Sequence, residues 1–287
     1  MHKSYNFLFR YRTRTLEHTV HVRGARLPYS DQGGGEPVLL LHGALTDHRM
    51  WREHAAQLAH DHRVLAYTQR FHWGAVSDEA AFQYGVPTHS ADLVAFVDTI
   101  AAGPVHLVAW SYSCQVALDA MVRRPDLFAS VFAYEPGHPS WLHDEADLAA
   151  FGQQAHAAFG PVFEAVAAGD NGAATERLLA ASGGRPGYFA SQPDHVRQCQ
   201  LDNAGTLPLL LNQQPAAPLT LQDLDAAGVP LQVLYGARSH AMYRLVGKVF
   251  PGSGAVEGQG HMWPQEDPHG FCDTLRTWLS SQAGRLA

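Results

Sequence analysis

Short, largely apolar runs alternate with amphipathic stretches along the first half of the chain. The runs are residues 38–41, "RVLAY" from Arg63, "VHLVAW" from Val105 and "SVFAYE" from Ser130. A strand that is apolar on both faces is typical of a parallel sheet covered on both sides. Between the runs, residues 48–60, 88–102 and 112–124 carry apolar positions at helical spacing. The alternation predicts an α/β fold with a mostly parallel central sheet and helices on both faces.

The alternation is preceded by a hairpin and resumes near the C-terminus. "HTVHVRGARLPYSD" predicts two strands that turn at Gly24, followed by "DQGGGEP" as a loop. "PLQVLYG" from Pro230 predicts a further strand, followed by a helix near residues 241–249, a short strand at "GAVEG" and a last helix from Pro268 to Gln282. One sheet is therefore expected to draw strands from both ends of the chain.

Residues 137–225 interrupt this pattern. They hold the helical stretches "DLAAFGQQAHAAF", "NGAATERLLAAS" and "DHVRQCQLDNAG" and no strand-like run. We therefore expect a core domain made of residues 1–136 and 226–287, into which residues 137–225 are inserted as a helical cap.

Charge and composition restrict the kinds of partner. The formal net charge is -7, and 16% of the residues are charged, with neither a basic patch nor an acidic tail. No nucleic acid partner is expected, and the substrate should be a small, fairly neutral molecule. No apolar stretch approaches the length of a membrane span, and the N-terminal "MHKSYNFLFRYRTRTLEH" lacks the apolar region of a signal peptide. No membrane partner is expected, and a homodimer stays open.

Cysteines and histidines give no sign of a disulfide framework or a metal site. The three cysteines are widely spaced and odd in number, which favours a reducing, cytoplasmic compartment. The close histidine pairs, His48 with His54 and His60 with His62, lack an HExxH pattern or a neighbouring cysteine. We therefore expect surface histidines, no metal and no cofactor.

One serine lies where a buried strand gives way to a helix. Residues 105–110 are strand-like and residues 113–123 helix-like, so Ser111 must occupy a tight turn. Such a turn needs an unusual backbone and small neighbours two residues to either side, here Ala109 and Ser113. A serine before a helix is also a common N-cap, so the surrounding sequence must distinguish a nucleophile from a cap.

The segment "AWSYS", residues 109–113, resembles the nucleophile elbow G-x-S-x-G of the α/β-hydrolase family, with both glycines replaced by small residues. "LLLHGALTDHRMW", residues 39–51, resembles the loop that supplies one oxyanion-hole amide in this family. The resemblance implies Ser111 as the nucleophile and the backbone amides of Ala44 and Tyr112 as the oxyanion hole. The second amide begins a helix, where the helix dipole favours negative charge.

A histidine near the C-terminus completes the resemblance. "GQGHMWPQEDP", residues 258–268, matches the family's ending G-H-x-x-P-x-E-x-P and implies His261 as the general base. A serine hydroxyl becomes a strong nucleophile when an imidazole removes its proton. The family usually places an aspartate after the strand "LQVLYG", but no acidic residue occurs between Asp225 and Glu257.

Glu135 is our candidate for the missing acid. It ends "SVFAYEP" and leaves its strand at the same edge of the sheet as the nucleophile. Some relatives, notably haloalkane dehalogenases, carry their acid there. We expect Glu135 to orient His261. The alternatives are a solvated glutamate, a salt bridge with Arg238, or Asp225 or Asp223 as the acid.

These residues predict a serine hydrolase that cleaves an ester-type bond of a small, largely apolar substrate through an acyl-enzyme intermediate. Because the nucleophile is not an aspartate, dehalogenase and epoxide hydrolase chemistry are disfavoured. One alternative is hydrolysis of a carbon–carbon bond in a diketone-like substrate. Relatives of that type tend to carry tryptophan directly after the histidine, where this chain has Met262. A second alternative is a weakly catalytic or non-catalytic receptor or cyclase.

Large side chains supply candidates for the substrate pocket. Those nearest to the motifs are Trp110, Trp141, Arg238 and Trp263. Within the expected cap the apolar candidates are Phe151, Phe159, Tyr188 and "LPLLL" from Leu207. Most of the cap residues are expected to form the cap's own core.

Overall fold

One mostly parallel sheet crosses the molecule. The computed structural model describes residues 17–78, 81–100 and 103–283; the N-terminal residues 1–16 and the last two positions of the helix expected at 88–102 lie outside these ranges. The strand order is β1-β2-β4-β3-β6-β7-β8-β9, with β5 beside β2. The strands are β1 (Glu17–Val22), β2 (Ala25–Gly33), β3 (Pro37–Leu41), β4 (Arg63–Tyr67), β5 (Val76–Ser77), β6 (Val105–Trp110), β7 (Phe128–Tyr134), β8 (Leu231–Gly236) and β9 (Gly254–Val256).

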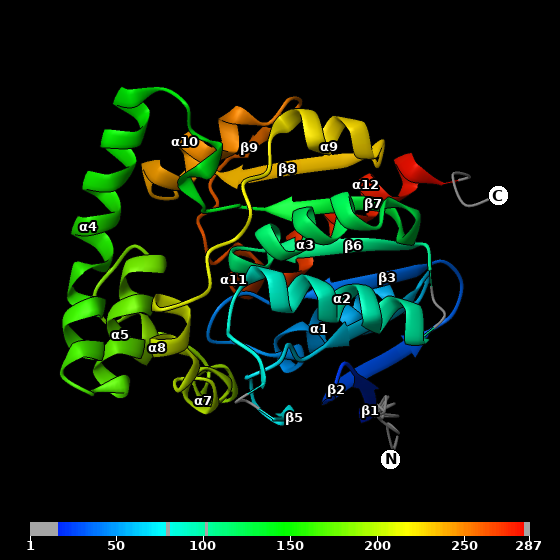
Figure 1. Cartoon of the computed structure of the whole chain (residues 1–287), viewed down its shortest axis with the longest axis horizontal. Helices are drawn as coiled ribbons and strands as arrows, with labels where there is room; N and C mark the ends of the chain where they lie inside the picture. Colours follow the sequence, from blue (N-terminus) through cyan, green and yellow to red (C-terminus); the bar gives the residue numbers. More distant parts are fainter. Residues whose placement is uncertain (1–16, 79–80, 101–102, 284–287) are drawn as a thin grey trace, which may run out of the picture.

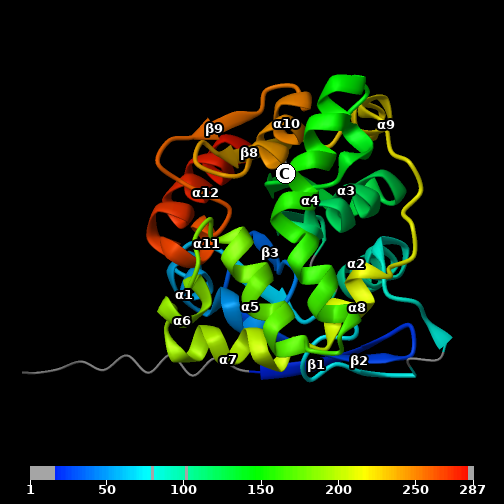
Figure 2. The same cartoon turned by 90° about the vertical axis from the view of Figure 1, so that its left-hand side faces the viewer.

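Pairing is parallel from β4 through β3, β6, β7 and β8 to β9, and antiparallel where β2 meets β1, β4 and β5. Helices lie on both sides of this sheet. Figure 2 shows α2 (Val86–Ile100), α3 (Tyr112–Arg123) and α9 (Leu221–Ala227) on one side and α1 (Arg52–Leu58) and α12 (Pro268–Gln282) on the other. The α/β fold with a mostly parallel sheet, expected from the alternation of apolar runs, is confirmed.

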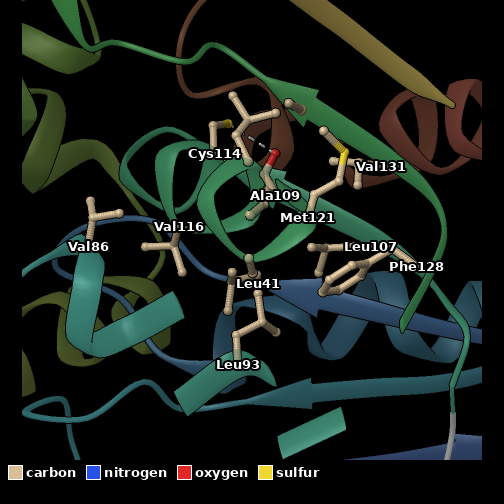
Figure 3. Packing of buried hydrophobic residues seen from close by; sticks show 14 of the residues in the cluster. Leu41, Val86, Leu93, Leu107, Ala109, Cys114, Val116, Met121, Phe128 and Val131 are labelled. Atoms are coloured by element: carbon tan, nitrogen blue, oxygen red, sulfur yellow. Dashed lines mark hydrogen bonds between the residues drawn. The ribbon is translucent and has the colours of Figure 1, made fainter. Parts of the chain in front are cut away.

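The apolar strands contribute side chains to two hydrophobic cores, one on each face of the sheet, because successive side chains of a strand point to opposite faces. In β3, Leu39 and Leu41 join the cluster under α2 and α3, whereas Val38 and Leu40 join the cluster under α1 and α12. Figure 3 shows the first cluster, in which Leu41 and its neighbours from β6 and β7 pack against side chains of α2 and α3. This double burial explains why the strands are apolar on both faces.

Short helices connect or precede the main elements. They are η1 (His48–Trp51), η3 (Pro125–Leu127), η4 (Pro139–Trp141), α10 (Ala241–Val249) and α11 (Trp263–Glu266). No helix in the described ranges is both long enough and apolar enough to cross a membrane.

Helices gather beyond the carboxyl ends of β7 and β8, at the left of Figure 1. They are α4 (Glu145–Ala167), α5 (Asn171–Ser182), α6 (Tyr188–Ser191), α7 (Asp194–Asp202) and α8 (Thr206–Leu211). We call residues 137–220 the helical segment. The boundary expected at residue 225 falls inside α9, which packs against α3 and so lies with the sheet.

Two local expectations were wrong. "DQGGGEP" is not a loop throughout, because β2 continues to Gly33 and pairs with β4, where Asp31 forms an ion pair with Arg63 at 2.6 Å. The helix expected over 48–60 is split, because it begins as the 3₁₀ turn η1 and ends at Leu58.

The expectation of surface histidines was also wrong for several of them. Within the described ranges, the buried histidines outside the expected active site are His42, His48, His54, His72, His89 and His106. A neutral imidazole can be buried where its ring packs and its nitrogens bond: His48 Nδ1 lies 2.7 Å from Thr68 Oγ1, and the ring of His54 meets Trp51 edge-on at 4.7 Å. Sequence spacing does not reveal such partners.

A buried carboxylate joins the helical segment to the sheet. Asp47 follows β3 and accepts hydrogen bonds from Arg49 and, at 2.7 Å, from Asn203 after α7. Arg49 also pairs with Asp202 at 2.8 Å. Burial alone raises the pKa of Asp47, but the donors from Arg49 and Asn203 outweigh it and lower the pKa to about 2. The helical segment is therefore fixed to the loop that follows β3.

Replacing Asn203 by alanine should lower the free energy of unfolding by about 2–3 kcal/mol, because a buried carboxylate loses a donor and Trp73 N loses the acceptor it bonds at 2.8 Å. Urea unfolding followed by circular dichroism measures this. Asn212→Ala is the matched control, because that exposed amide bonds within α8. A change below about 0.5 kcal/mol for Asn203→Ala, the level of ordinary surface substitutions, would contradict the prediction.

Candidate active site

Ser111 has an unusual backbone at the carboxyl edge of the sheet. β6 ends at Trp110 and α3 begins at Tyr112, so Ser111 alone makes the turn, with φ 59° and ψ -121°. Positive φ is uncommon for a residue with a Cβ and persists only where neighbours hold it. Here the Ser111 amide donates to Tyr134 O of the neighbouring β7 at 2.9 Å. The turn carries Ser111 to the wall of a cavity.

The residues around the turn are small because the backbones approach closely. A Cβ on Gly43 would lie 3.1 Å from Trp110 O and 3.4 Å from Ser111 Cβ. Ser113, at the position of the elbow's second glycine, contributes its hydroxyl to the packing, lying 2.9 Å from Leu41 O and 3.0 Å from Trp110 N. A serine is therefore accommodated where the family motif has glycine.

His261 and Glu135 are in direct contact. His261 Nδ1 lies 2.6 Å from Glu135 Oε2, and both side chains are buried. Glu135 Oε1 accepts hydrogen bonds from Gly236 N at 2.6 Å and from the hydroxyl of Ser239. These donors come from the last residue of β8 and from the loop after it, where the family's acid usually lies. That loop holds the carboxylate of Glu135 instead of supplying its own.

The other acidic candidates do not reach the histidine. Asp225 is exposed, and Asp223 caps α9 through Thr220. Arg238 is exposed and makes no ion pair with Glu135 in the described part of the chain. Within the described ranges the carboxylate that contacts His261 is that of Glu135.

Three aromatic residues hold His261 in place. The ring of Tyr243 stacks on the imidazole at 4.2 Å with an interplanar angle of 12°. Trp110 Nε1 donates to His261 O at 2.9 Å, and Tyr134 OH donates to Gly260 O at 2.6 Å. Sequence reasoning missed Tyr243 and Tyr134, because neither belongs to a motif. With Nδ1 on the carboxylate, Nε2 is the ring nitrogen that Glu135 does not contact, and His261 lines the cavity.

Ala44 and Tyr112 line the cavity beside Ser111. Tyr112 is the first residue of α3, and the first amides of a helix have no partner within it. The loop of Ala44 is fixed by His42, whose Nε2 accepts from Gln69 N at 3.0 Å while Nδ1 donates to Gly43 O at 2.9 Å. This pattern requires a neutral ring, and burial lowers the pKa of His42 to about 3.

The cavity has a volume of about 380 Å³ and lies between the serine turn and the helical segment. Most of the wall that the helical segment contributes is apolar: Phe159, Val162, Phe163, Leu178, Leu179, Leu207, Leu210 and Leu211. Phe159 and Leu207, named from the sequence, thus line it. Phe151 and Tyr188 are packed in the two main cores instead.

Of the four candidates near the motifs, Trp110 lines the cavity and the other three do not. Trp263 begins α11 and packs against Tyr134 and Phe271 in the core on the α12 side. Trp141 is buried against Phe250, and Arg238 is exposed. Proximity to a motif did not determine where these side chains point.

A parallel sheet whose carboxyl edge carries a serine at a strained strand-to-helix turn, beside a histidine held by a carboxylate, is the arrangement of the α/β hydrolases. The sequence model of the alpha/beta hydrolase family matches residues 38–274 of this chain. The chain belongs to the alpha/beta hydrolase family.

The individual relatives and solved structures described next share less than a third of their aligned residues with this chain. The uncharacterized hydrolase YraK of Bacillus subtilis is 29% identical over 125 residues, which cover 44% of this chain and 46% of YraK. The alignments to the first curated relatives span less than half of those proteins' own lengths. A thermophilic esterase from Thermogutta terrifontis is similar in structure, with a TM-score of 0.67 at 20% identity over 94% of this chain and 99% of the esterase. An enol-lactonase from Burkholderia xenovorans gives 0.70 at 19% identity over 92% and 100%. At these identities the similarity shows the fold alone.

Proposed function

We propose that this chain is a serine hydrolase that cleaves ester-type bonds of small, largely apolar substrates. Ser111 is the nucleophile, His261 the general base, Glu135 the orienting acid, and the amides of Ala44 and Tyr112 form the oxyanion hole. The observation that carries the proposal is the buried contact of 2.6 Å between His261 and Glu135 at the cavity wall that also holds Ser111. The esterase and the enol-lactonase that share the fold add support.

The reaction proceeds in two halves. His261 Nε2 takes the proton from Ser111 Oγ as the oxygen attacks the carbonyl carbon, and the amides of Ala44 and Tyr112 stabilise the resulting oxyanion. His261 then returns the proton to the departing alcohol, which leaves an acyl-serine. A water molecule attacks this ester with His261 again as the base, and the carboxylic acid and free serine are released.

Glu135 acts on the base and not on the substrate. Its carboxylate holds the Nδ1 proton of His261 and stabilises the imidazolium that forms when Nε2 takes the serine proton. Two donors bond Oε1 and keep this carboxylate in place, while Oε2 stays available for the contact with the ring. Tyr243 stacks on the imidazole and Trp110 bonds the backbone of His261, so the base is restricted in both its ring and its main chain.

Labelling with a fluorophosphonate tests the proposal, because this probe phosphonylates a serine activated by a neighbouring base. We expect one adduct, located on Ser111 by peptide mass spectrometry, and turnover of p-nitrophenyl butyrate. Ser111→Ala should bind no probe and turn over no ester. An unlabelled wild-type chain would instead favour a receptor or cyclase. Preferential turnover of a vinylogous diketone would favour carbon–carbon bond hydrolysis.

A further inference from the structure

A buried glutamine in the cavity wall is unused by the proposed mechanism. Gln115 lies on α3 one helical turn beyond Ser111, is 6% exposed, and lines the cavity. Ser111 directly precedes α3, and Gln115 lies on the first turn of that helix. Both residues line the same cavity.

The orientation of the Gln115 amide is determined by a tryptophan. Trp141 Nε1 lies 3.1 Å from Gln115 Oε1. An indole N–H can only donate, so the amide oxygen must face Trp141 and the amide nitrogen must point the other way. Trp141 is itself 1% exposed and packed against Phe250, which fixes the donor.

Gln115 Nε2, with its two N–H donors, has no hydrogen-bond partner among residues 17–78, 81–100 and 103–283. Because Gln115 is buried and lines the cavity, the cavity is where an acceptor can reach this nitrogen. Buried polar groups normally find partners. A fixed, unpaired amide nitrogen in a largely apolar cavity therefore indicates that the missing acceptor belongs to the ligand.

We propose that Gln115 is a specificity-determining residue that donates a hydrogen bond to a second oxygen of the substrate, in addition to the scissile carbonyl. This inference rests on the proposed function. Ser111 directly precedes α3 and Gln115 lies on the first turn of α3, and both line the cavity, so this oxygen is expected within a few bonds of the scissile carbonyl carbon. The favoured substrates are then esters whose acyl part carries a 3-oxo or 3-hydroxy group and an apolar tail that contacts Phe159, Phe163 and Leu207.

Ethyl 3-oxooctanoate and ethyl octanoate form a test pair that differs in this oxygen alone. The measured quantity is the ratio of kcat/KM for the two esters, followed by acid release, and it is compared between variants so that intrinsic ester reactivity cancels. Gln115→Glu keeps an oxygen for Trp141 and removes the donor. We expect this variant to lower the ratio by roughly 10- to 100-fold, because the second oxygen of the 3-oxo ester is then buried without a hydrogen-bond donor.

Two further variants separate the lost donor from other effects. Gln115→Met removes the donor without adding charge and should lower the ratio to a similar extent. Gln213→Glu adds a charge to the wall of the same cavity from the loop after α8. It should leave the ratio within about 3-fold of the wild type, because the donor of Gln115 remains. A ratio unchanged in both Gln115 variants would overturn the proposal.

Failure of the proposed function gives a different result. In that case the wild type hydrolyses neither ester and Ser111 resists the fluorophosphonate. Calorimetric titration of the same ester pair into Ser111→Ala and into Ser111→Ala/Gln115→Glu then tests Gln115 by binding alone. Tighter binding of the 3-oxo ester that Gln115→Glu abolishes supports the assignment, and equal binding of both esters to both variants overturns it.

Discussion

Glu135→Gln should lower kcat for p-nitrophenyl butyrate by about 10⁴-fold while leaving the fold intact, an effect on the scale of replacing a triad aspartate by asparagine. The reason lies in the donors on the carboxylate. Gly236 N and the Ser239 hydroxyl both donate to Oε1, so a glutamine must keep its oxygen there. Its amide nitrogen then faces His261 Nδ1, which must become an acceptor. The proton moves to Nε2, and His261 cannot accept the proton of Ser111.

Two measurements separate this tautomer effect from a general loss of structure. Circular dichroism should show an unchanged spectrum for Glu135→Gln, and ¹⁵N chemical shifts of the His261 imidazole should report the proton on Nε2 instead of Nδ1. Asp225→Asn is the matched control, because this exposed carboxylate on α9 lies away from the ring. An activity of Glu135→Gln within 10-fold of the wild type, or a larger loss for Asp225→Asn, would exclude Glu135 as the acid.

The sheet and its carboxyl edge could be predicted from the sequence for a simple physical reason. Strands buried on both faces must be apolar throughout, so β3, β4, β6 and β7 are visible as short runs with no knowledge of their partners. In a parallel sheet each run also delivers its C-terminal residue to the same edge. That rule is enough to bring Ser111 and Glu135 together, since β6 and β7 are neighbours.

The pocket could not be predicted in the same way, because it depends on side-chain direction and on partners distant in sequence. Trp263 follows His261 by two residues, yet it starts α11 and points into the opposite core. The orientation of the Gln115 amide could not be predicted from the sequence either, because Trp141 in η4 determines it. Similarly, the buried Arg70 of the loop after β4 forms an ion pair with Asp92 of α2 at 2.7 Å. No local sequence pattern predicts this contact.

Because several histidines are buried in neutral form, the chain should unfold cooperatively in mildly acidic solution, near pH 5. Burial lowers the pKa of His42 to about 3 and those of His54 and His72 to about 4, and it holds the pKa of His89 well below the ordinary value of 6.5. In the unfolded chain these rings take up protons below about pH 6.5, whereas in the folded chain they stay neutral. Their contribution to stability is therefore complete above pH 6.5 and is lost progressively as the pH falls towards 4.

The size of this effect is comparable with the stability of a whole domain. At pH 5.5 each of the three histidines His42, His54 and His72 favours unfolding by about 1.4 kcal/mol. Together they remove about 4 kcal/mol from a total that is typically 5–15 kcal/mol, and His89 adds to the loss in the same direction. Urea unfolding at a series of pH values between 8 and 5.5 measures the loss. His54→Gln should reduce the slope by about 1.4 kcal/mol per pH unit, whereas His60→Gln, at an exposed site, should leave it unchanged. A free energy of unfolding that stays constant over this range would show that these rings accept protons in the folded state.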